Sequence, residues 1–258
     1  MKKTTLTCCL MLAMALAGCS DKKAADPQNG QSNTAGTENT NASASETSDL
    51  EADADRQATD GQASLQDMGQ RMRSSIINVP SNGNAKAGIR EFARAYTQQF
   101  QAYAPNQALA SYAKDPKAFK AGSNGPFINV NDKNGYARCI VEDRYYLTTE
   151  MCFWRRANGH SLVGVYLRKA HESNHAQYAY AFYDYDPSSA MMTPDMEVND
   201  LVETTIKRFL TDDVTIELPQ EGKDLSLSFI TYKDREADDY DAQVKTLKWT
   251  GNGFRLMP

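Results

Sequence analysis

The spacing of apolar residues changes its period partway along the chain, at Phe127. Before this point large apolar residues recur every three or four positions, as on one face of a helix. After it they alternate with polar residues, which is the pattern of half-buried strands. The dipeptides Asn134-Gly135 and Asn158-Gly159 fall between alternating segments and favour tight hairpins, because a type I′ turn needs positive φ at both central residues. The change predicts an α+β fold, with N-terminal helices packed on a mainly antiparallel, hairpin-built β-sheet.

Three helices are predicted ahead of the strands. The first begins at a capping box formed by Ser64 and Asp67 and continues toward Pro80. The second spans residues 85–103 and is expected to stop at Pro105, and a shorter one covers residues 107–113. The first two carry apolar stripes at helical spacing: Leu65, Met68, Met72 and Ile76 on the first, and Ile89, Phe92, Tyr96, Phe100 and Tyr103 on the second.

Eight strands are predicted from period-two alternation and from the turn residues that bound it. They span residues 136–142, 147–157, 160–168, 177–185, 214–218, 225–232, 244–249 and 254–256. A further helix is expected near residues 200–209, between the fourth and fifth strands. The last two strands form a closing hairpin, which predicts that Trp249 lies in the core.

The segment from Ser20 to Gln62 has the composition of a tether. It holds nine acidic and three basic residues, and Leu50 is its only large apolar residue. Such a segment cannot bury enough surface to offset the entropy lost on ordering. We therefore expect a disordered acidic tether over residues 19–62 and a single α+β domain over residues 63–258. That domain is nearly neutral, which argues against nucleic-acid binding, since nucleic-acid sites need a basic footprint.

The first residues of the chain have a distinct pattern. Lys2 and Lys3 precede a short apolar run that ends in Leu16-Ala17-Gly18-Cys19. The run covers about 12 residues, fewer than the roughly 20 that a transmembrane helix needs. The pattern resembles the lipobox of bacterial lipoproteins. The alternative is a secreted soluble protein cleaved after Ala15-Leu16-Ala17.

The lipobox resemblance implies a signal peptide over residues 1–18 and lipidation of Cys19 by a diacylglycerol and an N-linked acyl chain such as palmitate. More than one chain satisfies the physical requirement for stable membrane anchoring. The residue after the cysteine is Ser20 rather than the aspartate that retains such proteins at the inner membrane of many Gram-negative bacteria. The resemblance therefore favours the cell outer membrane over the inner membrane.

Two cysteines remain in the domain, Cys139 and Cys152. If residues 136–142 and 147–157 form a hairpin with its tip between Tyr145 and Tyr146, the two cysteines face each other across it. In an oxidising cell envelope this register predicts a disulfide bond. A register slip of one residue would turn one sulfur to the other face, and the alternative is a pair of small buried thiols.

Residues 171–175 match the zinc motif H-E-x-x-H, which makes His171, Glu172 and His175 candidate metal ligands and catalytic groups. The motif belongs on a helix, yet strands are predicted up to residue 168 and from residue 177. A third ligand would have to come from Glu197, Glu203 or His160. We interpret the segment as a polar hairpin loop and predict no cofactor, with a zinc-dependent hydrolase as an alternative function.

A row of aromatic residues alternates along residues 178–185, with Tyr178 and Tyr180 on one face and Tyr183 and Tyr185 on the other. One face must pack on the core, and the other is a candidate surface for stacking on sugars or binding a protein partner. Ordinary cross-strand packing is the alternative explanation. The sequence thus predicts a lipid-anchored cell-envelope protein with a non-catalytic binding or structural domain, and a carbohydrate-binding accessory that uses an exposed tyrosine row is an alternative function.

Overall fold

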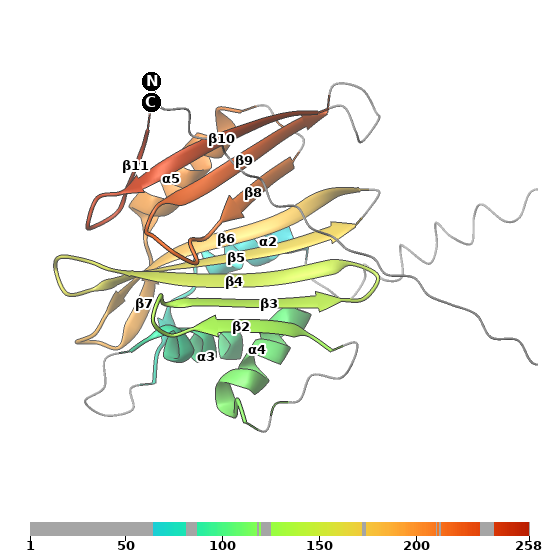
Figure 1. Cartoon of the computed structure of the whole chain (residues 1–258). Coiled ribbons are helices and arrows are strands. Elements are labelled where there is room, and N and C mark those ends of the chain that lie inside the picture. Colours follow the sequence, from blue (N-terminus) through green and yellow to red (C-terminus); the bar gives the residue numbers. More distant parts are fainter. Residues whose placement is uncertain are drawn as a thin grey trace, which may run out of the picture. The chain divides into compact units, whose positions relative to one another are not determined.

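The computed structural model describes residues 64–80, 87–117, 119, 125–171, 174–209, 211, 213–232 and 240–257. All of these residues belong to one unit of the chain, Thr47–Pro258. Within them the chain forms four helices and two antiparallel sheets, an α+β fold as the sequence predicts (Figure 1). None of the helices within these ranges combines the length and the apolar character needed to cross a membrane. The predicted signal peptide, the predicted lipidation site and the whole of the predicted tether fall outside the described residues.

The helices begin where local chemistry caps them. Ser64 caps α2 by accepting a hydrogen bond from the Asp67 backbone N–H at 3.1 Å, and its hydroxyl donates to the Asp67 carboxylate at 2.8 Å. Pro105 does not end a helix, because it occupies the first turn of α4, where a missing N–H costs nothing. Ile76 lies beyond the end of α2 and is exposed, so the predicted stripe is one residue too long. The helices are α2 (Leu65–Met72), α3 (Ile89–Gln99), α4 (Ala104–Lys114) and α5 (Met196–Lys207).

The larger sheet has seven strands in the order β1-β7-β6-β5-β4-β3-β2. Its strands from β2 to β7 follow one another as antiparallel neighbours, and β1, which comes from between α2 and α3, pairs with β7 at the far edge. The strands are β1 (Ile77–Asn78), β2 (Phe127–Asn131), β3 (Tyr136–Glu142), β4 (Tyr146–Arg155), β5 (Ser161–His171), β6 (Asn174–Asp186) and β7 (Met191–Pro194). Three of these strands were not among those predicted: β1 and β7 at one side of the sheet and β2 at the opposite edge.

A second sheet of four strands, in the order β11-β10-β9-β8, follows α5. Its strands are β8 (Asp213–Glu217), β9 (Leu225–Tyr232), β10 (Tyr240–Trp249) and β11 (Phe254–Leu256). Trp249, which was expected in the core, is partly buried and packs against it, with its ring stacked on that of Trp154 at 6.0 Å between centroids. This sheet and α5 cover the face of the larger sheet that α2, α3 and α4 leave open (Figure 1).

The larger sheet is consequently buried on both faces. Along β6, Ala181 and Tyr183 pack with the helices, while Tyr180 and Phe182 pack with α5 and the second sheet. Helix α2 comes especially close to β6, since a Cβ atom added at Gly69 would lie 3.3 Å from the Ala179 Cβ. The domain therefore has two cores, one on each side of the same sheet.

The predicted disulfide between Cys139 and Cys152 is not formed, and both cysteines are free and buried. In the observed register of β3 and β4, Cys139 faces Thr149 and Tyr136 faces Cys152. The hairpin tip lies nearer to β3 than expected, which offsets the two cysteines by three positions. Because the offset is odd, Cys139 points into the core beneath the helices and Cys152 into the core between the sheets.

Candidate functional site

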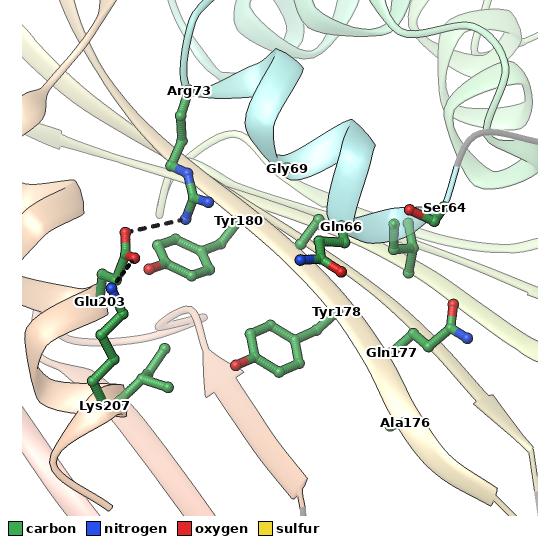
Figure 2. Close-up of a pocket in the computed structure, with 13 residues that line it drawn as sticks. Ser64, Gln66, Gly69, Arg73, Ala176, Gln177, Tyr178, Tyr180, Glu203 and Lys207 are labelled. Carbon is green, nitrogen blue, oxygen red and sulfur yellow. Dashed lines mark ion pairs between the residues drawn. The ribbon is translucent and has the colours of Figure 1, made fainter.

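A pocket of about 540 Å³ lies at the edge of β6, between α2 and α5 (Figure 2). It exists because β7 pairs only with residues Tyr183 to Asp186 of β6, so that the first half of β6 has no strand on this edge among the described residues. The polar side chains that line the pocket come from α2, from β6 and from α5: Ser64, Gln66, Arg73, Gln177, Tyr178, Tyr180, Glu203 and Lys207.

One wall of the pocket carries a small cluster of charges. The Glu203 carboxylate lies 2.6 Å from the Lys207 Nζ, one turn further along α5, and 3.8 Å from an Arg73 guanidinium nitrogen. The hydrogen bond from Lys207, together with the positive charges of Lys207 and Arg73, lowers the pKa of Glu203. Two cations thus share one carboxylate, and the cluster carries a net positive charge.

Two tyrosines supply the aromatic surface. Figure 2 shows the rings of Tyr178 and Tyr180 extending from β6 toward the side of the pocket formed by α5. The Arg73 guanidinium lies over the Tyr180 ring, 5.1 Å from its centroid. Burial raises the pKa of both tyrosines, so their hydroxyls stay neutral at physiological pH and act as hydrogen-bonding groups.

The position of α5 is fixed by hydrogen bonds to the backbone of β6. The Asn199 side chain accepts from the Phe182 N–H at 3.0 Å and donates to the Phe182 carbonyl at 2.8 Å. Asp195 caps the helix by accepting from the Val198 N–H at 3.0 Å, and Arg156 joins Asp195 to Asp184. Because Glu203 follows Asn199 by one helical turn, these bonds place the charge cluster beside the tyrosines.

The tyrosine row is therefore divided between two environments. Tyr178 is partly buried and Tyr180 is 4 % exposed, and both line the pocket. Tyr183 and Tyr185, the other candidate binding residues, are the row that packs, because they point into the core beneath the helices. There the Tyr183 hydroxyl donates to the Met72 carbonyl at 2.9 Å, and the Tyr185 ring packs edge-on against Phe92.

The H-E-x-x-H segment does not have the helical backbone that a zinc protease requires. His171 ends β5 and His175 lies near the start of β6, and β5 and β6 pair as antiparallel strands. Glu172 lies outside the described residues, as do the side chains of both histidines. His160 lies at the opposite end of β5, where its Nδ1 contacts Asp184 at 2.6 Å. Across the described part of the chain, no three His, Cys, Asp or Glu side chains are placed to hold a metal ion.

The charged wall was not predicted as a site. Glu203 was considered only as a distant metal ligand, and Arg73 and Lys207 were not considered at all. The spacing of Glu203 and Lys207 by four positions on a predicted helix does indicate an ion pair. Nothing in the sequence indicates that Arg73 would join them, because that contact depends on how α2 and α5 dock on β6.

The described side chains of the pocket offer aromatic, amide and charged groups to a polar ligand. Ser64, the one serine among these lining residues, is engaged by Asp67 at the cap of α2. Comparisons with protein-family models, with curated proteins and with solved structures find no match to the chain. A function must therefore be inferred from the residues and the geometry of the pocket.

Proposed function

We propose that the chain is a lipid-anchored cell-envelope protein whose α+β domain binds a glycan in the pocket beside β6. The observation that carries the binding role is the meeting of two tyrosine rings with amide and charged side chains in one pocket of about 540 Å³. In the proposal the N-terminal helices are a packed layer on the hairpin-built sheet, and α2 supplies one wall of the site.

A sugar suits this arrangement for chemical reasons. Its C–H faces pack on flat rings such as that of Tyr178, while its hydroxyls both donate and accept hydrogen bonds. The amides of Gln66 and Gln177 offer both functions at the pocket wall. The excess positive charge of Arg73 and Lys207 over Glu203 favours a sugar that carries a carboxylate.

The membrane attachment is proposed from the lipobox residues alone. Acyl chains on Cys19 would hold the protein at the membrane, and the acidic tether would let the domain reach its ligand away from the lipid headgroups. Since the residue after the cysteine is Ser20, we propose the outer membrane as the location.

Glucuronic acid and glucose form a matched pair of probes for the pocket, because they differ only in the carboxylate. We expect isothermal titration to give tighter binding of glucuronic acid, and Lys207→Ala to weaken it about tenfold. Lys207 is 72 % exposed, so its loss leaves the fold intact. Lys248→Ala, which removes an exposed lysine far from the pocket in sequence, is the control and should bind as the wild type does.

Tyr178→Ala should weaken the binding of both sugars, because it removes the stacking surface rather than the charge. Equal affinities for the two sugars, or an equal loss in the Lys248→Ala variant, would contradict the assignment of the pocket. Attachment is tested separately: Cys19→Ala should release the protein from membranes, and Ser20→Asp should move it to the inner-membrane fraction. Unchanged fractionation of both variants would refute the anchor.

A further inference from the structure

A second cavity, of about 480 Å³, lies between the two sheets and is separate from the pocket beside β6. Its floor is the face of β3, β4 and β5 that points away from the helices. Its roof is β8 and the segment that leads to β9. We call it the inter-sheet chamber. Glu217 and Gln220 in its lining are exposed, so the chamber opens to solvent at the end of β8.

The floor of the chamber is a line of polar side chains in register across three strands. Arg138 on β3 faces Glu150 on β4, and Glu150 faces Tyr166 on β5. The Arg138 Nε lies 3.1 Å from a Glu150 oxygen, and Arg168, two residues beyond Tyr166, lies 3.6 Å from Asp213 on β8. Apolar and aromatic side chains make up the hydrophobic cluster around this line.

Hydrogen-bond donors in the chamber are left without partners. Tyr166 is 2 % exposed, and its hydroxyl donates no hydrogen bond to the protein, although the backbone of Ile216 on β8 lies beside it. The Nε atom of Arg168 is also buried without a hydrogen bond, and the Arg138 Nε, although paired with Glu150 at 3.1 Å, does not form a well-aligned hydrogen bond with it. Buried polar groups in native proteins are satisfied in the great majority of cases, and an exception calls for a physical cause.

Other buried tyrosines of the domain satisfy this rule. The Tyr103 hydroxyl donates to the Arg168 carbonyl at 2.6 Å, and the Tyr183 hydroxyl donates to the Met72 carbonyl at 2.9 Å. The Tyr136 hydroxyl, at the edge of the same chamber, accepts from the Gln220 amide at 3.3 Å. Tyr166 differs from them because its hydroxyl, at the wall of the chamber beside the Ile216 backbone, donates to no protein acceptor.

The charges of the chamber select the kind of molecule that fits. Arg138 and Arg168 are each offset by a carboxylate, Glu150 and Asp213 respectively. Glu217, Glu221 and Asp224 add negative charge at the roof. An anion would satisfy the unpaired donors but would meet this excess of carboxylates. A neutral polyol satisfies the donors through its oxygens and donates its own hydrogens to the carboxylates.

We propose that the inter-sheet chamber is a binding site for a small neutral polyhydroxylated molecule of the size of a monosaccharide or a cyclitol. Arg138, Tyr166 and Arg168 donate to its oxygens, and Glu150 and Thr148 accept from its hydroxyls. The volume of the chamber lies within the range of small-molecule sites. This inference does not depend on the glycan pocket, with which the chamber shares no lining residue.

Tyr166→Phe is the decisive variant, because it removes one hydroxyl that donates to no acceptor in the protein. Titration of the whole chain with myo-inositol, followed by ¹⁵N–¹H NMR, should give saturable shifts of residues around the chamber. Tyr166→Phe should fold with unchanged or higher stability and bind myo-inositol about tenfold more weakly, as expected for one lost hydrogen bond. Tyr183→Phe should lose stability and keep the wild-type affinity.

Inorganic phosphate is the anionic probe and should cause no saturable shift at the chamber. Saturable binding of phosphate without that of myo-inositol would overturn the choice of a neutral ligand. The absence of saturable binding by either probe would show that the chamber holds solvent alone. Loss of stability in Tyr166→Phe would reveal a protein partner for the hydroxyl and remove the basis of the proposal. Lys207→Ala should bind myo-inositol normally, which separates this result from that of the glycan pocket.

Discussion

The Asn199 side chain forms hydrogen bonds with the backbone of β6 at the edge that has no neighbouring strand among the described residues. Replacing Asn199 tests whether these hydrogen bonds hold α5 in position. The residue is 2 % exposed. Its side-chain oxygen accepts from the Phe182 N–H at 3.0 Å, and its nitrogen donates to the carbonyls of Phe182 and Asp195, both at 2.8 Å. Asn199→Ala removes all three bonds and replaces them with a methyl group.

The expected loss of stability depends on which backbone groups keep a hydrogen-bond partner in the variant. The Phe182 carbonyl still accepts from the Asp195 N–H at 2.8 Å, and the Asp195 carbonyl still accepts from the Asn199 N–H at 3.0 Å. The Phe182 N–H loses its partner and is left buried, which costs about 1–3 kcal/mol. The two bonds that the Asn199 amide donates are also lost, while the higher helix propensity of alanine returns about 0.5 kcal/mol. We therefore expect the free energy of unfolding to fall by about 2–4 kcal/mol.

Urea denaturation followed by circular dichroism measures this loss as a lower midpoint with an unchanged m value. For a domain of this size it corresponds to a melting temperature lower by about 6–12 °C. Asn252→Ala is the control, because its side chain also accepts from a backbone N–H, that of Ala157 at 3.1 Å, but is exposed. It should cost less than about 1 kcal/mol. Equal losses of stability in Asn199→Ala and Asn252→Ala would refute the claim that the Asn199 hydrogen bonds hold α5 on β6.

Three further perturbations have defined outcomes. Gly135→Ala should cost about 2 kcal/mol of stability in urea denaturation, because Gly135 has a φ of 67° and a Cβ there would lie 2.5 Å from the Phe153 ring. Gly159→Ala is the control. A Cβ at Gly159 would meet nothing within 4 Å, so this variant should cost only about 1 kcal/mol. Arg156→Ala should cost roughly 3 kcal/mol, since it leaves two largely buried carboxylates without their shared cation, and a loss below about 1 kcal/mol would exclude a structural role. Burial raises the pKa of Glu150 above its usual 4.5, so its contribution to stability is present below about pH 4.5 and is lost as the pH rises through the raised value. Glu150→Gln should remove this decline in the urea midpoint above about pH 4.5, and an unchanged decline would contradict the assignment.

Features set by local chemistry were predictable from the sequence. Strands β3, β9 and β11 have the predicted bounds, because alternation and turn residues define them without help from distant segments. The stripe from Ile89 to Tyr103 is buried along its whole length. Strands β1 and β7 were not predictable, because each is only a few residues long and is stabilised by pairing with the other across more than a hundred positions of sequence.

Contacts between distant elements account for the remaining differences. The tyrosines of β6 were expected to leave one face exposed, but the second sheet folds over the face that the helices do not cover. The hairpin of β3 and β4 turns through Asp143, Arg144 and Tyr145 rather than between two tyrosines, and this change alone separated the two cysteines. The pocket joins Arg73 to Glu203, a contact that no local pattern indicates.

The separation of the cysteines makes each thiol a reporter of one layer of the domain. Burial raises the pKa of both Cys139 and Cys152 to about 12, so neither reacts with thiol reagents while its layer stays closed. Cys139 becomes reactive when the helices detach from the sheet. Cys152, whose Sγ lies 3.4 Å from the Pro219 carbonyl, becomes reactive when the second sheet lifts away. The order in which the two thiols are labelled under native conditions therefore reveals which half of the molecule opens first.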